Sequence, residues 1–327
     1  MTQDNLDSAS LTTEEQENTL TEGAPQEVAP PNPQKTKDTR KTRTLWGDAW
    51  HRLKGNKLAI AGAIWVLLMV IIALSADLWV PQTLGDPTAI PTDTAQSSKL
   101  PPSAQHPFGT DILGRDVLSR VIYGARVSLQ VGLLATSISI AIGLILGALA
   151  AYYGGIWDTI IMRFADIFLA FPYTLFVIAL LSVLGPAFRN VFIAIGILGW
   201  PQIARVFRSS IFSVKANDYI AAARALGAGD LRIMIRHIFP NAMAPIIVYG
   251  TMSIGGAILT ESALSFLGMG VQPPTPSWGL MIAEGQKHLS TAPWLMLFPG
   301  IAILTTVLAF TLMGDGLRDA LDVKMKD

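Results

Sequence analysis

Residues that could do chemistry are few in this 327-residue sequence, and they lie far apart. It contains no cysteine, and its four histidines (51, 106, 237 and 288) form no HxxxH or HExxH pair. A disulfide framework and a thiolate metal site are therefore excluded, and a metal enzyme is disfavoured. No GxxxxGK[ST] segment occurs, so we expect no phosphate-binding loop for ATP. These absences predict a protein without a catalytic residue, a metal site or a cofactor of its own.

Three ionisable residues fall inside or beside long apolar segments: Arg163, Asp166 and Glu261. Ionisable groups at such positions are functional candidates. Arg163 and Asp166 are three residues apart on one helical face, where they can pair with each other. Glu261, near the outer end of a predicted span, can hydrogen-bond to a neighbouring helix. A proton relay needs several such groups in series, so we interpret these residues as isolated polar sites within the membrane.

The elements that carry these residues are predicted by the spacing of charges. Charged residues make up 15% of the chain and hydrophobic residues 51%, whereas a soluble domain has about 25% charged residues. This composition excludes a disordered chain and a basic nucleic-acid-binding protein. Six long intervals carry few or no charges, and a membrane-spanning helix needs roughly 17–25 apolar residues. We therefore predict an all-α, polytopic membrane protein with six spans, near 58–80, 127–152, 160–184, 190–210, 242–268 and 292–314.

The Lys and Arg residues predict the orientation. Segments 1–57, 154–163, 205–240 and 315–327 hold eight, one, six and three of the 24 basic residues, and the remaining six lie in the alternate segments. Because basic residues accumulate on the cytoplasmic side, both termini are predicted to be cytoplasmic. Residues 1–34 contain seven acids and no base. We expect 1–44 to be a disordered cytoplasmic extension and 45–327 to form the membrane domain.

Details of the spans predict their packing and shape. Gly143 and Gly147 are expected to let two helices approach closely, and Pro172, Pro201 and Pro245 are expected to introduce kinks. Before the second span, apolar and polar residues alternate at helical spacing. This pattern favours an amphipathic helix lying on the membrane surface, with Val117, Leu118, Val121 and Ile122 on one face and Arg115, Asp116, Ser119 and Arg120 elsewhere.

The stretch 213–241, between the fourth and fifth spans, is longer than a connection requires. Asp218 is placed to cap a helix that runs to Leu226 and stops at Gly227. Asp230 is placed to cap a second helix, from Leu231 to Phe239, that ends at Pro240 and Asn241. The pattern predicts a cytoplasmic helix–turn–helix with a shallow, alanine-rich docking surface for another protein. An ordinary long loop lying on the membrane is the alternative.

This stretch resembles a known motif. AAARALG (221–227), followed by nine residues and then His237 to Pro240, is similar to the EAA loop of bacterial ABC-importer permeases, with Ala221 at the usual Glu position. His237 at the first position of the ending resembles the peptide-permease subgroup. Four further segments resemble that subgroup as well: WHRLKGNKLAIAG (50–62), FGTDILGRDVLSRVIYGARVSL (108–129), ESALSFLGMGVQPPTPSWG (261–279) and GDGLRDALD (314–322).

The resemblance implies the type I ABC-importer permease fold and the second permease subunit of an oligopeptide or dipeptide importer in the bacterial inner membrane. The implied partners are a second homologous permease, two cytoplasmic ATPases that bind ATP and Mg²⁺, an external substrate-binding protein and the lipid bilayer, but no nucleic acid. Since Ala221 cannot form the ion pair of the usual Glu, we expect docking to rest on small-residue packing, Gly227 and Arg224. The implied ATPase-coupling residues are Tyr219, Ala221, Ala222, Ala223, Arg224, Gly227, Ala228, Asp230, His237 and Pro240.

Other functions remain possible at this stage. Nickel, glutathione and some sugar importers share the implied architecture. A self-sufficient secondary transporter is disfavoured because no inverted repeat is detectable, buried charge is scarce and the cytoplasmic loop is elaborate. A membrane-anchored scaffold would not need six kinked spans.

Overall fold

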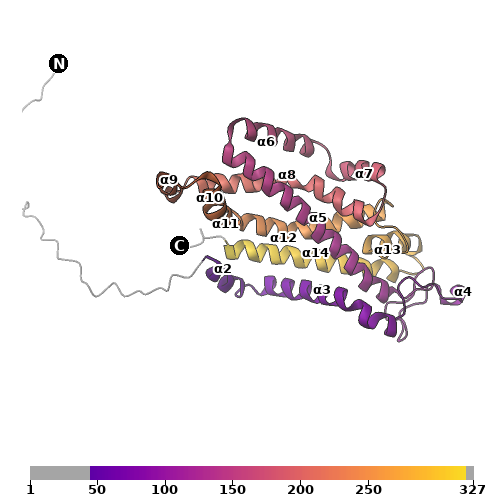
Figure 1. Ribbon diagram of the computed structural model, residues 1–327. Coiled ribbons are helices and arrows are strands. Elements are labelled where there is room, and N and C mark those ends of the chain that lie inside the picture. Colours follow the sequence, from indigo (N-terminus) through magenta and orange to yellow (C-terminus); the bar gives the residue numbers. More distant parts are fainter. Residues whose placement is uncertain (1–44, 322–327) are drawn as a thin grey trace, which may run out of the picture. The chain divides into compact units, whose positions relative to one another are not determined.

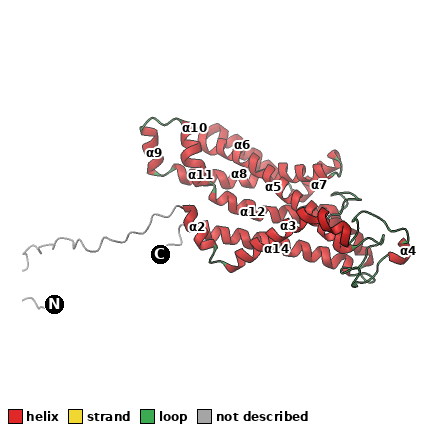
Figure 2. Ribbon diagram, turned by 60° about the horizontal axis from the view of Figure 1, so that its bottom comes forward, coloured by secondary structure: helices red, strands yellow, loops and turns green. Residues whose placement is uncertain are grey.

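The computed structural model describes residues 45–321, which are mostly helical (Figures 1 and 2). Within this range there is no β-strand, only an isolated bridge between Thr110 and Asp116. The all-α prediction is therefore confirmed. The expected disordered extension, 1–44, lies outside the described residues, as do residues 322–327.

Long apolar helices make up most of the fold. Five of the described helices are long and apolar enough to cross a membrane, and a sixth crossing results if a bent pair of shorter helices is counted as one span. The five are α3 (Lys57–Thr83), α5 (Val117–Tyr153), α8 (Phe188–Lys215), α12 (Ala244–Phe266) and α14 (Trp294–Leu321), and the bent pair is α6 (Gly155–Ala170) with α7 (Tyr173–Leu184).

The predicted kinks differ in outcome. At Phe171 and Pro172 the third crossing bends by 89°. A proline disfavours the helical conformation in the residue before it, and Phe171 is extended, with φ −89° and ψ 141°. Helix α8 continues through Pro201. Pro245 lies in the first turn of α12, where its missing N–H costs no hydrogen bond.

The prediction of a surface-lying helix before the second span is wrong. Helix α5 is continuous over 37 residues from Val117, about 55 Å. The polar residues Arg115, Ser119 and Arg120 are buried and do not face lipid headgroups. Their polar groups find protein partners instead, because Asp111 and Glu284 lie within ion-pair distance of both arginines.

Glycines allow α5 to pack directly on α8. A Cβ atom added at Gly143 would lie 2.6 Å from the Ile203 side chain, and one added at Gly147 would lie 2.7 Å from the carbonyl oxygen of Ala204. No larger residue fits at these distances without a shift of the helices. The predicted close approach at these two glycines is confirmed.

The shorter helices gather at the two ends of the bundle (Figure 1). One end holds α4 (Thr94–Ser97), α13 (Trp278–Gly285) and the 3₁₀ turn η3 (Gln286–His288). The other end holds α2, the last turn of α14 and the whole 216–243 segment. The elements at that end are α2 (Leu45–Leu53), α9 (Asp218–Ala225), α10 (Asp230–Ile233), the π-helical turn η2 (Met234–Ile238) and α11 (Phe239–Ala242).

Candidate functional site

The segment between α8 and α12 forms a helix, a tight turn and a second helical stretch, as predicted. Gly227 adopts φ +82°, a conformation that favours glycine. Its N–H donates to the carbonyl oxygen of Arg224 at 3.0 Å, and the Ala228 N–H donates to that of Ala223 at 3.1 Å. These two bonds satisfy the last carbonyl groups of α9. Gly227 therefore ends the helix as its sequence position indicates.

The predicted capping roles of Asp218 and Asp230 are wrong by one position. Asn217 and Gly229 occupy the N-cap positions, and each aspartate is the first residue of its helix. A carboxylate in the first turn still interacts favourably with the helix dipole. The Asp230 carboxylate also accepts a hydrogen bond from the hydroxyl of Tyr152 at the end of α5.

The second helical stretch does not stop at Pro240. It passes from α10 through the π-helical turn η2 into α11, which runs to Ala242. Pro240 lies in the first turn of α11, where a proline is tolerated. The wider π turn supplies the extra residue that shifts Pro240 into this position. The side-chain amide of Asn241 donates to the carbonyl oxygen of His237 at 2.6 Å.

Contacts distant in sequence hold this segment against α5 and α8. Lys215, the last residue of α8, donates from Nζ to the carbonyl oxygens of Ala151 (3.2 Å) and Tyr152 (2.9 Å). The hydroxyl of Ser210 donates to the carbonyl oxygen of Ala242 at 3.0 Å. The Lys215 and Ser210 bonds lie at the two ends of the segment, and the Tyr152–Asp230 bond attaches its middle. Sequence reasoning missed Tyr152 and Lys215, because no local pattern links residues more than 60 positions apart.

Large apolar side chains dominate the exposed surface of this segment. Leu226, Leu231 and Ile235 are 89%, 73% and 62% exposed, while Ile220, Ile233 and Ile238 face the core. Sequence reasoning singled out the alanines and missed these three residues. The sequence could have indicated these three residues, because they are large apolar residues in a stretch outside the predicted spans. The ten residues that the resemblance implied for ATPase coupling are either exposed or half-buried. The exposed ones are Tyr219, Ala221, Ala222, Arg224, Gly227, Asp230 and Pro240, and the half-buried ones are Ala223, Ala228 and His237.

We use the term loop surface for the exposed side chains between Tyr219 and Pro240, among them Leu226, Leu231 and Ile235. Unpaired apolar side chains of this size on a well-anchored helix pair are typical of a protein-docking surface. The hydrogen bonds of the segment join it to α5 and α8.

The polar residues of the third crossing do not pair as simply as predicted. Arg163 lies 3.9 Å from the Asp166 carboxylate, but Arg205 of α8 forms a closer ion pair with that carboxylate. About two turns before Asp166 on α6, Asp158 accepts two hydrogen bonds from the Arg208 guanidinium, each at 2.5 Å. Asp158 and Asp166 thus tie α6 to α8, with Arg163 as the outer member of the second cluster.

Glu261 is fully buried. Its carboxylate accepts hydrogen bonds from the hydroxyl of Ser265 at 2.7 Å and from that of Ser128, on α5, at 3.2 Å. No lysine, arginine or histidine of the described residues forms an ion pair with it. The prediction of a hydrogen bond to a neighbouring helix is confirmed, and the bond joins α12 to α5.

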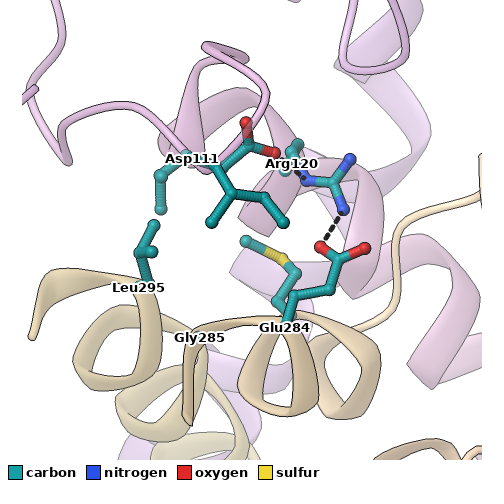
Figure 3. A pocket seen from close by; sticks show the side chains of 8 residues that line it. Asp111, Arg120, Glu284, Gly285 and Leu295 are labelled. Atoms are coloured by element: carbon teal, nitrogen blue, oxygen red, sulfur yellow. Dashed lines mark hydrogen bonds and ion pairs between the residues drawn. The ribbon is translucent and has the colours of Figure 1, made fainter. Parts of the chain in front are cut away.

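At the opposite end of the bundle, a buried ionic cluster joins α5 to α13 (Figure 3). Arg120 donates to Glu284 at 3.0 Å and lies 3.4 Å from Asp111, and Arg115 donates to Asp111 at 2.7 Å. The adjoining cavity, about 10 Å³, is the size of about one water molecule. With two cations, two carboxylates and no room for a ligand, the cluster positions α13 against α5.

Comparisons with known proteins agree with this architecture. Residues 140–327 match the family described as "Binding-protein-dependent transport system inner membrane component". Residues 44–102 match "N-terminal TM domain of oligopeptide transport permease C". The sequence is 44% identical to the dipeptide transport system permease protein of Alkalihalophilus pseudofirmus, over 90% of this chain and 95% of that one. It is also 44% identical to a glutathione transport system permease protein of Escherichia coli, over 87% and 92%.

A structural relative shares the fold at low sequence identity. The structure of the MetNI methionine ABC transporter in inward-facing conformations includes a chain that superposes with a TM-score of 0.52 and 16% identity. The match covers 62% of this chain and 96% of that chain.

Proposed function

From the premise that this chain belongs to the family of binding-protein-dependent transport system inner membrane components, we propose that it is a permease subunit of an ATP-driven importer of di- or oligopeptides. The match to the oligopeptide permease domain and the dipeptide-permease relative support this cargo. The permease role itself requires no reactive side chain. ATP and Mg²⁺ belong to separate ATPase subunits.

The loop surface is the observation that carries the proposal. Leu226, Leu231 and Ile235 are exposed on a helix pair that is attached to α5 through Tyr152 and to α8 through Ser210. An ATPase that binds this surface and moves on binding ATP would displace the segment. The displacement would then pass to α5 and α8, and the spans would alternate between inward and outward access.

The proposed assembly has four kinds of partner. A second homologous permease completes the transport path, two cytoplasmic ATPases bind the coupling loops, an external binding protein delivers the peptide, and the lipid bilayer surrounds the spans. The proposed location is the bacterial inner membrane, with both termini and the loop surface on the cytoplasmic side. The excess of Lys and Arg in 1–57, 205–240 and 315–327 supports this orientation.

Glutathione is a second candidate cargo. The glutathione-permease relative has the same 44% identity as the dipeptide-permease relative. Glutathione is itself a small peptide, so one transport path suits both cargoes. Calorimetry on the external binding protein, with dipeptides, oligopeptides and glutathione as ligands, separates these candidates.

Co-purification with the ATPases tests the proposal. We expect Leu226→Asp and Gly227→Asp to reduce both the association of the ATPases with the permease pair and peptide uptake, because the first places a charge in the docking contact and the second strains the turn. Leu289→Asp is the matched control, since Leu289 is an exposed leucine that directly follows η3, at the other end of the bundle. If the two loop variants retain full ATPase association, the proposed coupling role is wrong.

A further inference from the structure

Arginines flank the apolar residues of the loop surface. Arg224, Arg232 and Arg236 are exposed, and no carboxylate of the described residues lies within ion-pair distance of any of them. Asp230 is engaged by the Tyr152 hydroxyl, and Asp218 lies at the far end of α9. From Leu231 to Pro240 the segment contains two arginines and no acid. The second half of the loop surface is therefore cationic.

The arginines and the apolar residues form parallel rows. Leu231 and Ile235 are four residues apart, and so are Arg232 and Arg236, which places each pair on one side of the α10–η2 stretch. Both pairs are exposed. An apolar row beside a cationic row is suited to a protein groove that has an apolar floor and acidic side chains along one edge.

The position of the segment favours a protein over a lipid surface as the partner. Helix α9 and its turn lie beyond the ends of α5, α8, α12 and α14 in both views (Figures 1 and 2). Leu226, at this turn, is 89% exposed. A helix bound in the headgroup region lies in the membrane plane at the level of the span ends, whereas α9 and its turn lie past these ends.

We propose that the loop surface binds an ATPase groove whose floor is apolar and whose rim is acidic, with Arg232 and Arg236 as the permease's contribution to the ion pairs. This inference rests on the proposed coupling function and adds the chemistry of the partner. Ala221 stands where related loops have a glutamate. In this chain the permease therefore supplies the cations of the contact and the ATPase supplies the carboxylates.

Charge reversal tests the inference on the complete permease pair in nanodiscs, with the cognate ATPase subunits as the probe. We expect Arg232→Glu and Arg236→Glu each to weaken ATPase binding about tenfold at low salt. Binding of the unaltered complex should weaken as salt is raised. Arg232→Gln combined with Arg236→Gln should flatten this salt dependence. Lys287→Glu is the matched control, since Lys287 is exposed at the opposite end.

Ala221→Glu separates the two possible polarities of the contact. With an acidic groove, the added carboxylate weakens ATPase binding; with a basic groove, it strengthens binding and overturns the inference. If both arginine reversals leave the affinity for the ATPase unchanged, the inference is overturned as well. This includes the case in which the reversals lower binding only to anionic phosphatidylglycerol vesicles.

Leu226→Asp distinguishes failure of the acidic-groove inference from failure of the proposed coupling function. If it abolishes ATPase binding while the arginine reversals do not, the acidic-groove inference alone is wrong, whereas unchanged binding in Leu226→Asp rejects the coupling role.

Discussion

At the scale of single residues, the hydroxyl of Tyr152 connects the end of α5 to the loop surface through Asp230. Lys215 strengthens this junction, since its ammonium group caps the last carbonyl oxygens of α5 and lies 5.2 Å from the centre of the Tyr152 ring. A cation at the C-terminus of a helix is favourable. The junction thus combines a hydrogen bond of the Tyr152 hydroxyl with a contact between the Tyr152 ring and Lys215. A substitution at Tyr152 can remove the first and keep the second.

Tyr152→Phe removes the hydroxyl and keeps the ring. We expect a loss of about 1 kcal/mol in the free energy of unfolding, with a larger effect on coupling, because Asp230 is no longer attached to α5. Peptide uptake per ATP hydrolysed should therefore fall while ATPase association remains. The measurement is uptake and hydrolysis in the same proteoliposomes. Tyr153→Phe is the control, since Tyr153 is exposed and its hydroxyl makes no hydrogen bond to any of the described residues. Equal transport stoichiometry in the two variants would contradict this role for Tyr152.

At Glu261, the sequence predicted the kind of interaction but not the residues that take part in it. A lone acid in an apolar segment indicates a polar site, and that site exists. Its partners Ser128 and Ser265 were not predictable together, because Ser128 lies on another helix and many serines occur in the spans. A buried carboxylate needs hydrogen-bond donors, so the interaction itself could be predicted. That Ser128 is one of the donors depends on how α5 packs against α12.

At the scale of elements, charge-free intervals located the long helices because five of the six intervals reach the length needed to cross a bilayer, and the sixth, 190–204, continues as an apolar stretch past Arg205. The first residue of α5 could not be found this way. Arg115 and Arg120 suggested a surface helix, but the carboxylates of the nearby Asp111 and the distant Glu284 let them be buried. The 89° bend at Pro172 also exceeds an ordinary proline kink. Local sequence predicts where a helix weakens, and tertiary contacts set the resulting angle.

The packing of α5 on α8 leads to a prediction at this scale. Gly147→Ala places a methyl group 2.7 Å from a backbone carbonyl oxygen of α8, which no side-chain rotation relieves. We expect a loss of about 1–3 kcal/mol in stability, measured as a lower thermal-unfolding midpoint of the assembled permease pair. Gly256→Ala is the matched control, because Gly256 is helical and nothing lies within 4 Å of an added Cβ. Since Gly→Ala by itself favours a helix, equal destabilisation by both substitutions would contradict the contact with α8 as the cause.

At the scale of the whole molecule, the two ends of the bundle differ in their elements. One end carries the loop surface, α2 and the last turn of α14, and the other carries α13 and its buried ionic cluster (Figure 1). The net charge of zero conceals this polarity. Eighteen of the 24 basic residues fall in segments that the sequence predicts to be cytoplasmic. If the positive-inside rule applies to this chain, the loop surface and an ATPase share one compartment.

The absence of cysteine allows this orientation to be measured without background labelling. Leu226→Cys and Lys287→Cys place one thiol at each end, on residues that are exposed. We expect a membrane-impermeant maleimide to label Lys287→Cys in intact spheroplasts and Leu226→Cys only after permeabilisation. In inside-out vesicles the accessibilities should reverse, and added ATPase subunits should then protect Leu226→Cys but not Lys287→Cys. Labelling of Leu226→Cys from outside would contradict the orientation. Correct sidedness without ATPase protection would leave the orientation intact and count against docking at the loop surface.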